Sequence, residues 1–330
     1  MNETRLAILA HHGRRDFKLE NVGPWAKFFE VIYLKGIQIV GFREGPNVVV
    51  YNNISMRLLP GIFLQSKVTK VLIVWEPSVS NWLNFSRMIR KQFRAVYLFS
   101  EKWRLDDNDM ICFWPQGELI ASEKKIDRED KIVIFCSRKV SLIRDELYSL
   151  RTKVIDALGP QIDVFGPGWS DGKLKRMQSL IRRMIHDLPR MSFRASCNSL
   201  SSLFFVPHNY FGVVKVKNEV QQNYKYALVI ENSADYISEK LIDAIIAGCI
   251  PIYVGPMLEE MGFPEDIAYC VNPRVESVLE AFVLLRSNYE LQAGILKSGQ
   301  NFIASRSYAS NHVNTKVLYK IAQDLITRID

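Results

Sequence analysis

The segment 226–256 constrains the fold of this 330-residue chain more than any other part of it. It begins with an apolar run, passes through a polar turn at 231–236, and returns to an apolar run at 250–254. Between the two runs, apolar residues at helical spacing predict a helix over 238–247 that ends at Gly248, a residue typical of helix C-caps: Leu241, Ile242, Ile245 and Ile246. A strand, a helix and a second strand of these lengths indicate a βαβ unit with parallel strands.

Apolar runs alternate with polar or amphipathic stretches over the rest of the chain as well. In the first third, short apolar runs predict six strands: 6–9, 29–34, 37–40, 48–51, 71–74 and 96–99. A second series follows, with strands predicted at 131–136 and 162–165 and helices at 146–158, 276–288 and 311–329. The charged segment 117–131 separates the two series, as an interdomain linker or a long surface loop. We therefore expect the α/β class, with two Rossmann-like domains that face a cleft.

The charge balance of the chain points to anionic partners. Its formal net charge is +8 and its pI about 9.1, which favours nucleotide phosphates or a membrane surface but also fits an ordinary soluble basic protein. Nucleic acid is not an expected partner, because no aromatic residues interleave with the basic ones and no nucleic-acid-binding motif occurs. The basic amphipathic stretch 173–190 fits two interpretations: docking on an anionic lipid or polymer, or, more simply, a helix packed on the core with a solvated basic face.

The cysteines and the N-terminus bear on the compartment. Five cysteines at wide spacings, without a CxxC pair or histidines at ligand spacing, indicate free thiols in a reducing compartment rather than structural zinc. The chain contains no apolar run of 18 residues, so no transmembrane span is expected. Residues 1–6 are polar and the apolar run after them is too short for a signal peptide, so we expect a cytoplasmic protein.

Polar residues gather where the apolar run 226–230 ends, at the carboxyl end of a parallel strand, where open α/β sheets bind ligands. The start of the following helix would offer free N–H groups and a positive dipole end to an anion, and Lys240 would add a full charge. Such a site suits a diphosphate leaving group, while Glu231 and Glu239 can accept hydrogen bonds from sugar hydroxyls. The plainer alternative is that Glu231 and Asn232 only cap the turn and that Glu239 and Lys240 are surface charges.

The same segment resembles the signature of the α-1,3/1,4-fucosyltransferase family, glycosyltransferase family 10, in its bacterial form. The matching residues are Glu231-Asn232-Ser233, Tyr236-Ile237-Ser238-Glu239-Lys240, Gly248, Pro251 and Gly255-Pro256. Ile230 departs from the pattern by replacing an aromatic residue, and Ser238 replaces a threonine. The resemblance covers about residues 131–256 and implies the GT-B architecture, in which two Rossmann-like domains face a cleft.

A second stretch extends the resemblance to the donor diphosphate. Residues 151–158 are similar to a family helix whose leading arginine contacts that diphosphate, although Val154 and Ile155 replace its aromatic pair. The resemblance therefore implies a donor site made of Arg151 and the signature residues: Glu231, Asn232, Ser233, Tyr236, Glu239 and Lys240. Because side chains neutralise the diphosphate, no metal or other cofactor is required. An Asp-x-Asp spacing within 106–109 is expected to be a polar loop rather than a metal site.

The first domain of the family supplies a glutamate as general base, near a Trp-Glu-x-Pro turn. Residues 71–77 resemble that turn, with Pro77 directly after Glu76, and Glu76 would take the proton of the acceptor hydroxyl. Glu76 can also be only a turn residue, and Glu101, after the next predicted strand, is the rival base. His11 and His12, which could touch the acceptor, are more simply loop residues.

The resemblance implies an inverting transferase that moves L-fucose from GDP-β-L-fucose to a hydroxyl of a glycan acceptor, in an α-1,3-type linkage. It also implies an acceptor domain at 1–122, a nucleotide-sugar domain at 131–308, and a last helix at 309–330 that crosses back to the first domain. A bacterial-type enzyme would extend lipopolysaccharide or capsule chains, peripherally at an anionic inner membrane. Two alternatives stay open: a GT-B glycosyltransferase that uses another nucleotide sugar, because Glu231 and Glu239 also fit a Glu-x7-Glu spacing, and a non-catalytic relative that binds nucleotides.

Overall fold

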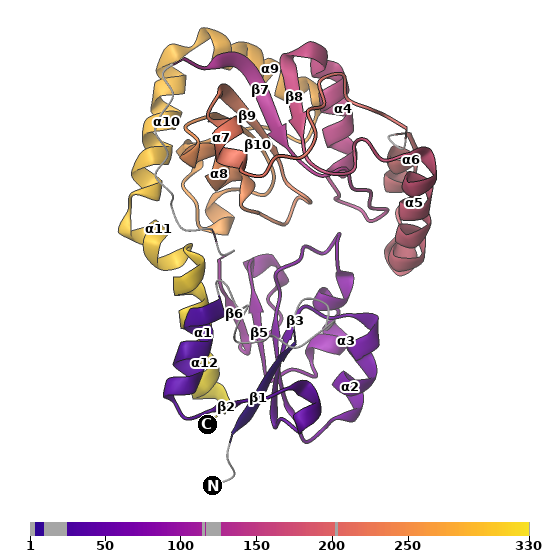
Figure 1. Ribbon diagram of the computed structural model, residues 1–330, viewed down its shortest axis with the longest axis vertical. Coiled ribbons are helices and arrows are strands. Elements are labelled where there is room, and N and C mark those ends of the chain that lie inside the picture. The colour runs from indigo at the N-terminus through magenta and orange to yellow at the C-terminus, as the bar shows by residue number, and fades with distance from the viewer. Residues whose placement is uncertain (1–3, 10–24, 114–115, 117–126, 202–203, 330) are drawn as a thin grey trace. The chain divides into compact units, whose positions relative to one another are not determined.

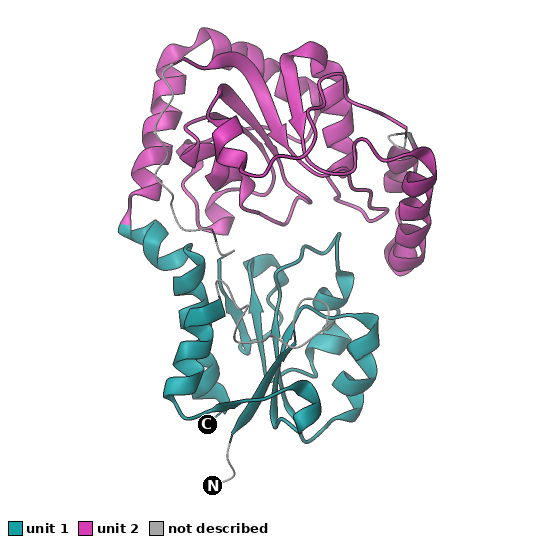
Figure 2. Ribbon diagram, in the orientation of Figure 1, with its two compact units in different colours: residues 1–118, 306–330 teal, residues 119–305 magenta. Residues whose placement is uncertain are grey.

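In the computed structural model, the described residues are 4–9, 25–113, 116, 127–201 and 204–329 (Figure 1). The chain forms two compact units: unit 1 holds residues 1–118 and 306–330, and unit 2 holds residues 119–305 (Figure 2). Each unit has its own parallel sheet and its own apolar core. His11, His12 and most of the expected linker at 117–131 lie outside the described residues.

Unit 1 is built on a sheet whose strands all run parallel, in the order β2-β1-β3-β4-β5-β6. The strands are β1 (Arg5–Leu9), β2 (Gln38–Ile39), β3 (Val48–Asn52), β4 (Thr69–Ile73), β5 (Ala95–Leu98) and β6 (Asp109–Ile111). Every residue of β3 is buried, as expected for a central strand of a parallel sheet that is covered on both faces. The short strand β6 has no counterpart in the sequence-based prediction.

The helices of unit 1 are α1 (Ala26–Leu34), α2 (Leu59–Leu64), α3 (Arg87–Arg90), α11 (Arg306–Asn311) and α12 (Asn314–Ile329). α1 shows that the strand predicted at 29–34 is wrong. The buried residues Phe28, Phe29 and Ile32 recur at helical spacing, because they lie on one face of a helix that starts three residues before the predicted strand. Lys27 and Glu30 form an ion pair one turn apart on the exposed side.

The C-terminal helix α12 completes the core of unit 1. It packs against α1, and its buried apolar residues join the core formed by the first strands: Val317, Leu318, Ile321, Ala322, Leu325 and Ile326. Tyr97 of β5 donates a hydrogen bond of 2.7 Å to Asp324 of α12. The end of the chain therefore belongs to the unit that its beginning forms (Figure 2).

Unit 2 also has a wholly parallel sheet, in the order β11-β10-β9-β7-β8. Its strands are β7 (Glu129–Phe135), β8 (Ile162–Phe165), β9 (Tyr224–Ile230), β10 (Ile250–Val254) and β11 (Tyr269–Cys270). Its helices are α4 (Tyr148–Leu158), α5 (Lys173–Asp187), α6 (Phe193–Ser201), α7 (Lys217–Gln221), α8 (Lys240–Ile246), α9 (Val275–Ser287) and α10 (Tyr289–Ile303). The four strands predicted at 131–136, 162–165, 226–230 and 250–254 are confirmed, with ends that agree within two residues.

The carboxyl ends of β7 and β8 approach each other closely at Gly166. This residue has a φ of +130°, and a Cβ atom there would lie 2.3 Å from the carbonyl oxygen of Cys136. The same carbonyl accepts a hydrogen bond of 2.9 Å from the indole Nε1 of Trp169. The loop after β8 is therefore fixed against the end of β7, at the edge of the sheet where parallel strands place ligands.

Helix α5 contradicts the simpler interpretation of 173–190, a helix packed on the core through its apolar residues. Only Arg176, Leu180 and Asp187 of α5 are buried. Six apolar side chains of α5 and the residue after it are exposed instead: Leu174, Met177, Ile181, Met184, Ile185 and Leu188. Within the described part of the chain, no helix is both long and apolar enough to cross a membrane.

We expect the cysteines to differ in reactivity, and alkylation can measure the difference. Cys197 and Cys270 are both exposed, but burial of its thiol and, after it, the nearby Glu265 raise the pKa of Cys270 to about 11. Since only the thiolate reacts, we expect iodoacetamide to modify Cys197 well before Cys270 at pH 8. The rate at Cys270 should rise about tenfold per pH unit until the pH approaches its pKa.

Peptide mass spectrometry after timed alkylation follows each cysteine separately, and a Cys197→Ser variant removes the fast site as a control. The buried thiols Cys136 and Cys249 should react only after unfolding. Equal rates at Cys197 and Cys270 at pH 8 would contradict the packing of β11 against β10.

Candidate functional site

In unit 2, the residues that follow β7, β8, β9 and β10 meet at one edge of the sheet, because parallel strands all end on the same side (Figure 1). The segment after β9, residues 231–238, forms the signature loop at this carboxyl edge. Glu146, before α4, pairs with Ser233 in an isolated antiparallel bridge, and the amide of Leu147 donates a hydrogen bond of 3.1 Å to the carbonyl of Asn232. The loop is therefore held against the segment that precedes α4.

Glu231 is the internal anchor of the signature loop. Its side chain is fully buried, and its Oε1 accepts a hydrogen bond of 3.0 Å from the backbone N–H of Ser238. Its Oε2 accepts bonds from the hydroxyl of Ser238 at 2.8 Å and from the ammonium of Lys240 at 3.0 Å. A buried carboxylate is stable only with charge-assisted partners such as these, so Glu231 closes the loop onto itself.

Arg151 is nearly fully buried, and its guanidinium caps the carboxyl end of β9. Its Nε and Nη2 donate to the carbonyl of Ile230 at 3.2 and 2.8 Å, and Nη2 also donates to the carbonyl of Glu231 at 2.8 Å and to Asn232 Oδ1 at 2.9 Å. The guanidinium lies over the ring of Tyr148, 4.9 Å from its centroid. All of its hydrogen bonds within the described residues use Nε and Nη2, which leaves Nη1 for a further acceptor.

Lys240 is the first residue of α8, so the helix begins two residues later than the sequence predicts. The N–H group of Ser238, expected to be free at the helix start, is taken by Glu231. The side chain of Lys240 is 14% exposed, and its ammonium is paired with Glu231, which partly neutralises its charge. Lys240 can reach an outside anion only as a shared charge, and α8, with seven residues, is too short for its dipole to bind one.

Glu239 lies on the outer side of the loop, with 47% of its side chain exposed. Its Oε1 is 3.2 Å from the ammonium of Lys217, which also contacts Asp243 at 3.3 Å. Burial alone would raise the pKa of Glu239, but the ammonium groups of Lys240 and Lys217 outweigh it and hold this pKa below its ordinary value. Glu239 is therefore ionised at neutral pH and open to a ligand.

The remaining signature residues divide by burial. Ser233 is fully buried and donates a hydrogen bond of 2.5 Å to Asp235, and Tyr236 is 5% exposed. Asn232 is half-buried, with its Oδ1 already bonded to Arg151. The structure thus brings the predicted donor residues together around one loop. The side chains of Glu231, Ser233 and Tyr236, however, are buried within that loop.

A cavity of about 580 Å³ lies beside the signature loop and contains basic residues that sequence reasoning missed. Ala234 of the loop lines it together with Arg144, Lys153 and Arg194, of which Arg144 has 86% of its side chain exposed. Arg144 stands in the segment between β7 and α4, which joins the carboxyl end of a predicted strand to a predicted helix, and that position was an available signal. Asp145 and Glu146 line the same cavity, and Asp145 lies 3.7 Å from Arg144. The three cationic side chains outnumber these two carboxylates, and a net positive lining suits a phosphate-bearing ligand.

The carboxyl edge of unit 1 holds Glu76. The backbone N–H groups of Trp75 and Glu76 both donate to Oδ1 of Asn53, at 3.1 and 3.2 Å, and the amide of Asn84 donates to the same oxygen at 2.7 Å. Asn53 is fully buried, follows β3, and has a φ of +63°. This asparagine, which sequence reasoning missed, fixes the turn that carries Glu76, and the pair Asn52-Asn53 after a predicted strand was its only signal.

Glu101 follows β5 at the same edge of the unit 1 sheet. Its side chain is 63% exposed and forms an ion pair of 3.4 Å with Arg104. The loop behind it is held by a buried ion pair of Arg90 with Asp109, and Arg90 also donates a bond of 2.5 Å to the carbonyl of Trp103. The carboxylate of Asp109 is thus paired with Arg90. Among the described residues, no group of three or more His, Cys, Asp or Glu is arranged to hold a metal ion.

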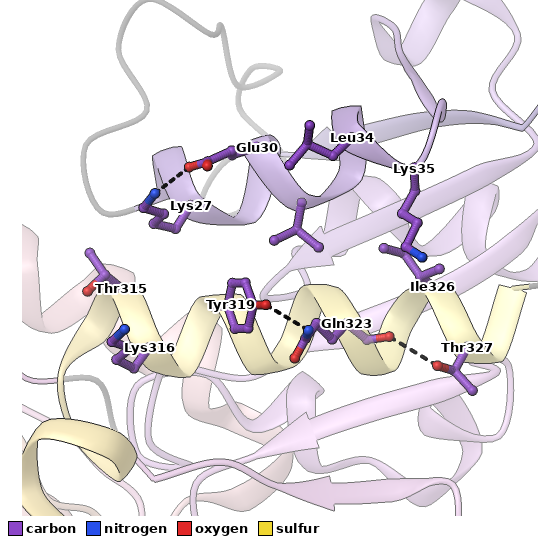
Figure 3. Close-up of a pocket in the computed structure, with 11 residues that line it drawn as sticks. Lys27, Glu30, Leu34, Lys35, Thr315, Lys316, Tyr319, Gln323, Ile326 and Thr327 are labelled. Carbon is purple, nitrogen blue, oxygen red and sulfur yellow. Dashed lines mark hydrogen bonds and ion pairs between the residues drawn. The ribbon is translucent and has the colours of Figure 1, made fainter. Parts of the chain in front are cut away.

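Another cavity, of about 860 Å³, lies between α1 and α12 of unit 1 (Figure 3). Several of the polar side chains labelled there have partners: Lys27 pairs with Glu30, Gln323 donates to Tyr319 at 2.8 Å, and Thr327 donates to the carbonyl of Gln323. None of its lining residues follows a strand, so it is a weaker candidate than the carboxyl edges.

No family model matches the sequence, and no curated protein matches it. Solved structures do match the fold. An α1,3-fucosyltransferase structure aligns with a TM-score of 0.59 at 12% identity over 99% of this chain and 90% of that one. The Anabaena protein Alr3699/HepE, in complex with UDP and glucose, aligns with a TM-score of 0.60 at 10% identity over 98% and 100%.

The chain has the GT-B fold. An α1,3-fucosyltransferase structure with GDP-fucose also matches, with a TM-score of 0.53 at 14% identity over 97% of this chain and 90% of that one. The expected α/β class and GT-B architecture are therefore confirmed, with one parallel sheet in each of the two units. At such low identities the likeness shows the GT-B fold and no more.

Proposed function

We propose that this GT-B protein is a glycosyltransferase that moves a sugar from a nucleotide sugar to a hydroxyl of a glycan acceptor. The observation that carries the proposal is the signature loop at the carboxyl edge of unit 2, with a basic cavity of about 580 Å³ beside it. A nucleotide sugar brings a diphosphate and several hydroxyls, and this edge offers cationic groups together with the ionised carboxylate of Glu239.

The donor that the proposal favours is GDP-β-L-fucose. Its support is the resemblance of residues 226–256 to the fucosyltransferase signature and the likeness to structures described as α1,3-fucosyltransferase with GDP or GDP-fucose. The runner-up is a UDP-sugar, because the HepE structures with UDP and UDP-glucose match this chain as well. A non-catalytic nucleotide-binding relative is the third possibility.

Each residue then has a part that follows from its burial. Arg151 positions the strand end and offers Nη1 to the diphosphate, while the exposed cations of the cavity neutralise the rest of its charge: Arg144, Lys153 and Arg194. Glu239 and Asn232 contact donor hydroxyls, and Lys240 adds a shared charge. Because side chains supply this charge, the reaction requires no metal or other cofactor.

The chemistry is a single displacement with inversion. A hydroxyl oxygen of the acceptor bonds to the anomeric carbon as the bond from that carbon to the diphosphate oxygen breaks, and the nucleoside diphosphate leaves with the electron pair. Glu76 accepts the proton of the attacking hydroxyl, as a general base on the turn that Asn53 fixes. In the proposal, the acceptor is a glycan and the linkage that the resemblance favours is α-1,3.

A thermal-shift panel with GDP, GDP-fucose, GDP-mannose, UDP, UDP-glucose and CMP tests the proposal. A ligand at about 100 times its Kd stabilises the folded state by about 2.7 kcal/mol, which raises Tm by roughly 5–10 °C for a domain of this size. We expect GDP and GDP-fucose to give this shift. An Arg144→Ala/Arg194→Ala variant should lose most of it, whereas Lys297→Ala, on an exposed face of α10, should retain it.

Three outcomes would change the proposal in different ways. A shift with UDP compounds and none with GDP compounds would keep the glycosyltransferase and reject fucose. An equal shift in the wild-type protein and the Arg144→Ala/Arg194→Ala variant would move the donor away from this cavity. No shift with any nucleotide would reject the proposed function.

A further inference from the structure

Helix α5 is bound to unit 2 through its polar residues. Arg176 is 5% exposed and donates hydrogen bonds to the carbonyls of Trp169 at 2.6 Å, Asp171 at 2.7 Å and Phe205 at 3.0 Å. Asp187 is fully buried and accepts a bond of 2.9 Å from the amide of Leu142. These bonds attach one face of α5 firmly, and that face contains only one buried apolar residue, Leu180.

The apolar residues of α5 form a different face, which the described structure leaves uncovered. They recur at intervals of three and four from the first turn to just past the last: Leu174, Met177, Ile181, Met184, Ile185 and Leu188. Each is between 40% and 74% exposed. A stripe of this length on one helix exceeds the scattered apolar side chains of an ordinary surface and marks an interaction site. Figure 1 shows α5 and α6 set at the side of unit 2, away from its sheet.

The charges around the stripe are almost all positive. α5 carries Lys173, Lys175, Arg182 and Arg183, and its only acidic residue is the buried Asp187, which pairs with Arg183 at 2.9 Å. Lys175 contacts Asp171 at 2.6 Å, but Arg182 has no acidic partner on the helix. At 100° per residue, Lys175 and Arg182 lie along one border of the stripe.

We propose that this stripe is a docking surface for an anionic lipid bilayer, with α5 lying in the plane of the headgroups. A helix with an apolar face and a border of lysine and arginine inserts its apolar side chains into the headgroup–acyl boundary, while its cations bind acidic headgroups. The exposed Phe193, at 87%, and the basic Arg190 extend the same chemistry past the end of the helix.

A second copy of the chain is the rival occupant, since residues spaced by three and four can also pair two helices. Face-to-face pairing of two α5 helices would bring the basic border of one copy next to that of the other. Neither copy has an exposed acidic residue on α5 to offset the repulsion. The charge pattern therefore favours anionic lipid over self-association.

Flotation of the full chain with vesicles of phosphatidylcholine, with and without phosphatidylglycerol, tests the proposal. We expect binding to the anionic vesicles and at least tenfold weaker binding to the neutral ones. Ile181→Glu/Ile185→Glu should lower the partition into anionic vesicles at least tenfold, and Arg182→Glu/Arg190→Glu should lower it about fivefold for each positive charge removed. Val283→Glu, which replaces an apolar residue 69% exposed on α9, is the matched control and should bind as the wild-type protein does.

Light scattering after gel filtration and thermal unfolding complete the test. The variants should unfold at the wild-type temperature, because the substituted side chains are exposed, so a loss of flotation reports the surface and not the fold. Absence of binding to anionic vesicles, or binding that Ile181→Glu/Ile185→Glu leaves unchanged, would overturn the proposal. A dimer that only the Ile181→Glu/Ile185→Glu variant dissociates would overturn it in favour of a second copy. All of these outcomes are independent of which nucleotide unit 2 binds.

Discussion

Replacing Arg151 by alanine will lower the free energy of unfolding by about 3–5 kcal/mol. Arg151 is 2% exposed, and its guanidinium donates hydrogen bonds to three acceptors at the end of β9: the carbonyls of Ile230 and Glu231 and Oδ1 of Asn232. Alanine would leave these three acceptors without the guanidinium donor, at a site with little access to water. An unpaired buried polar group costs about 1–3 kcal/mol, so three acceptors set a lower bound of about 3 kcal/mol. Removal of one partner of a buried charged pair typically costs about 3–5 kcal/mol, which is the range expected here.

Lysine at position 151 should restore only part of this stability. Its ammonium restores the charge, but it lacks the planar fork with which Nε and Nη2 both reach the carbonyl of Ile230. Urea unfolding of the wild-type protein, Arg151→Ala and Arg151→Lys measures the three free energies. Lys153→Ala is the control on the same helix, because Lys153 is exposed and, among the described residues, its ammonium bonds only Asn198. Its loss should cost less than about 0.5 kcal/mol.

Nucleotide binding separates two roles of Arg151. If it positions the strand end and also reaches the diphosphate, Arg151→Lys should weaken the nucleotide-induced Tm shift along with the stability. If it only positions the strand end, the stability of Arg151→Lys falls while its Tm shift stays. A free energy of unfolding that Arg151→Ala changes by less than 1 kcal/mol would contradict the hydrogen bonds on which both roles depend.

The strands β7, β8, β9 and β10 of unit 2 could be predicted from the sequence because buried parallel strands are short, continuous apolar runs bounded by polar turns. The two-residue edge strand β11 was not predicted, because neither of its residues is buried. The same rule failed at 29–34, where an apolar run belongs to α1. An apolar run of this length fits a strand and a buried helix equally well. The helical spacing becomes clear only when the residue before the run, Phe28, is included. β6 was missed for the opposite reason: it is short, and it begins at Asp109, which is buried only because Arg90 pairs with it.

The position of the signature loop could also be predicted, but the direction of its side chains could not. The pattern places Glu231 at a strand end, where a carboxylate can turn to a ligand or to its own loop. The choice depends on whether the N–H of Ser238 and the ammonium of Lys240 come within reach, and they do, at 3.0 Å each. Such distances follow from tertiary packing. The position of the loop could therefore be predicted from the sequence, but not which of its side chains remain accessible to a ligand.

Helix α5 shows the same limit on a larger scale. Periodicity identifies an apolar face but does not say that the core will cover it. In α5 the opposite, polar face packs against unit 2. Arg176 donates hydrogen bonds to three backbone carbonyls, and Asp187 accepts one from the amide of Leu142. Part of the compensation of these buried charges is distant in the sequence: Arg176 bonds the carbonyl of Phe205, 29 residues away, and Asp187 bonds the amide of Leu142, 45 residues away. The local pattern of the helix does not contain that information.

The second large effect is expected at Glu76. Replacing it by glutamine should lower kcat by about 10²- to 10⁴-fold, the usual contribution of a general base, because the amide cannot accept the proton of the acceptor hydroxyl. The backbone at Glu76 is fixed by Asn53, whose oxygen accepts three hydrogen bonds of 2.7–3.2 Å, so an isosteric side chain should leave the turn in place. The measurement is release of nucleoside diphosphate, with the donor that the thermal-shift panel identifies and a mixed glycan acceptor.

Glu101→Gln is the matched control, since Glu101 follows the neighbouring parallel strand at the same edge of the unit 1 sheet. Its side chain is 63% exposed and already paired with Arg104, so we expect its loss to change kcat by less than about threefold. The Tm shift with nucleotide should be equal in both variants and the wild-type protein, because unit 2 supplies the proposed donor site. A larger loss in Glu101→Gln would make Glu101 the base. Transfer that neither variant slows would mean that the proton leaves by a route other than these two strand ends.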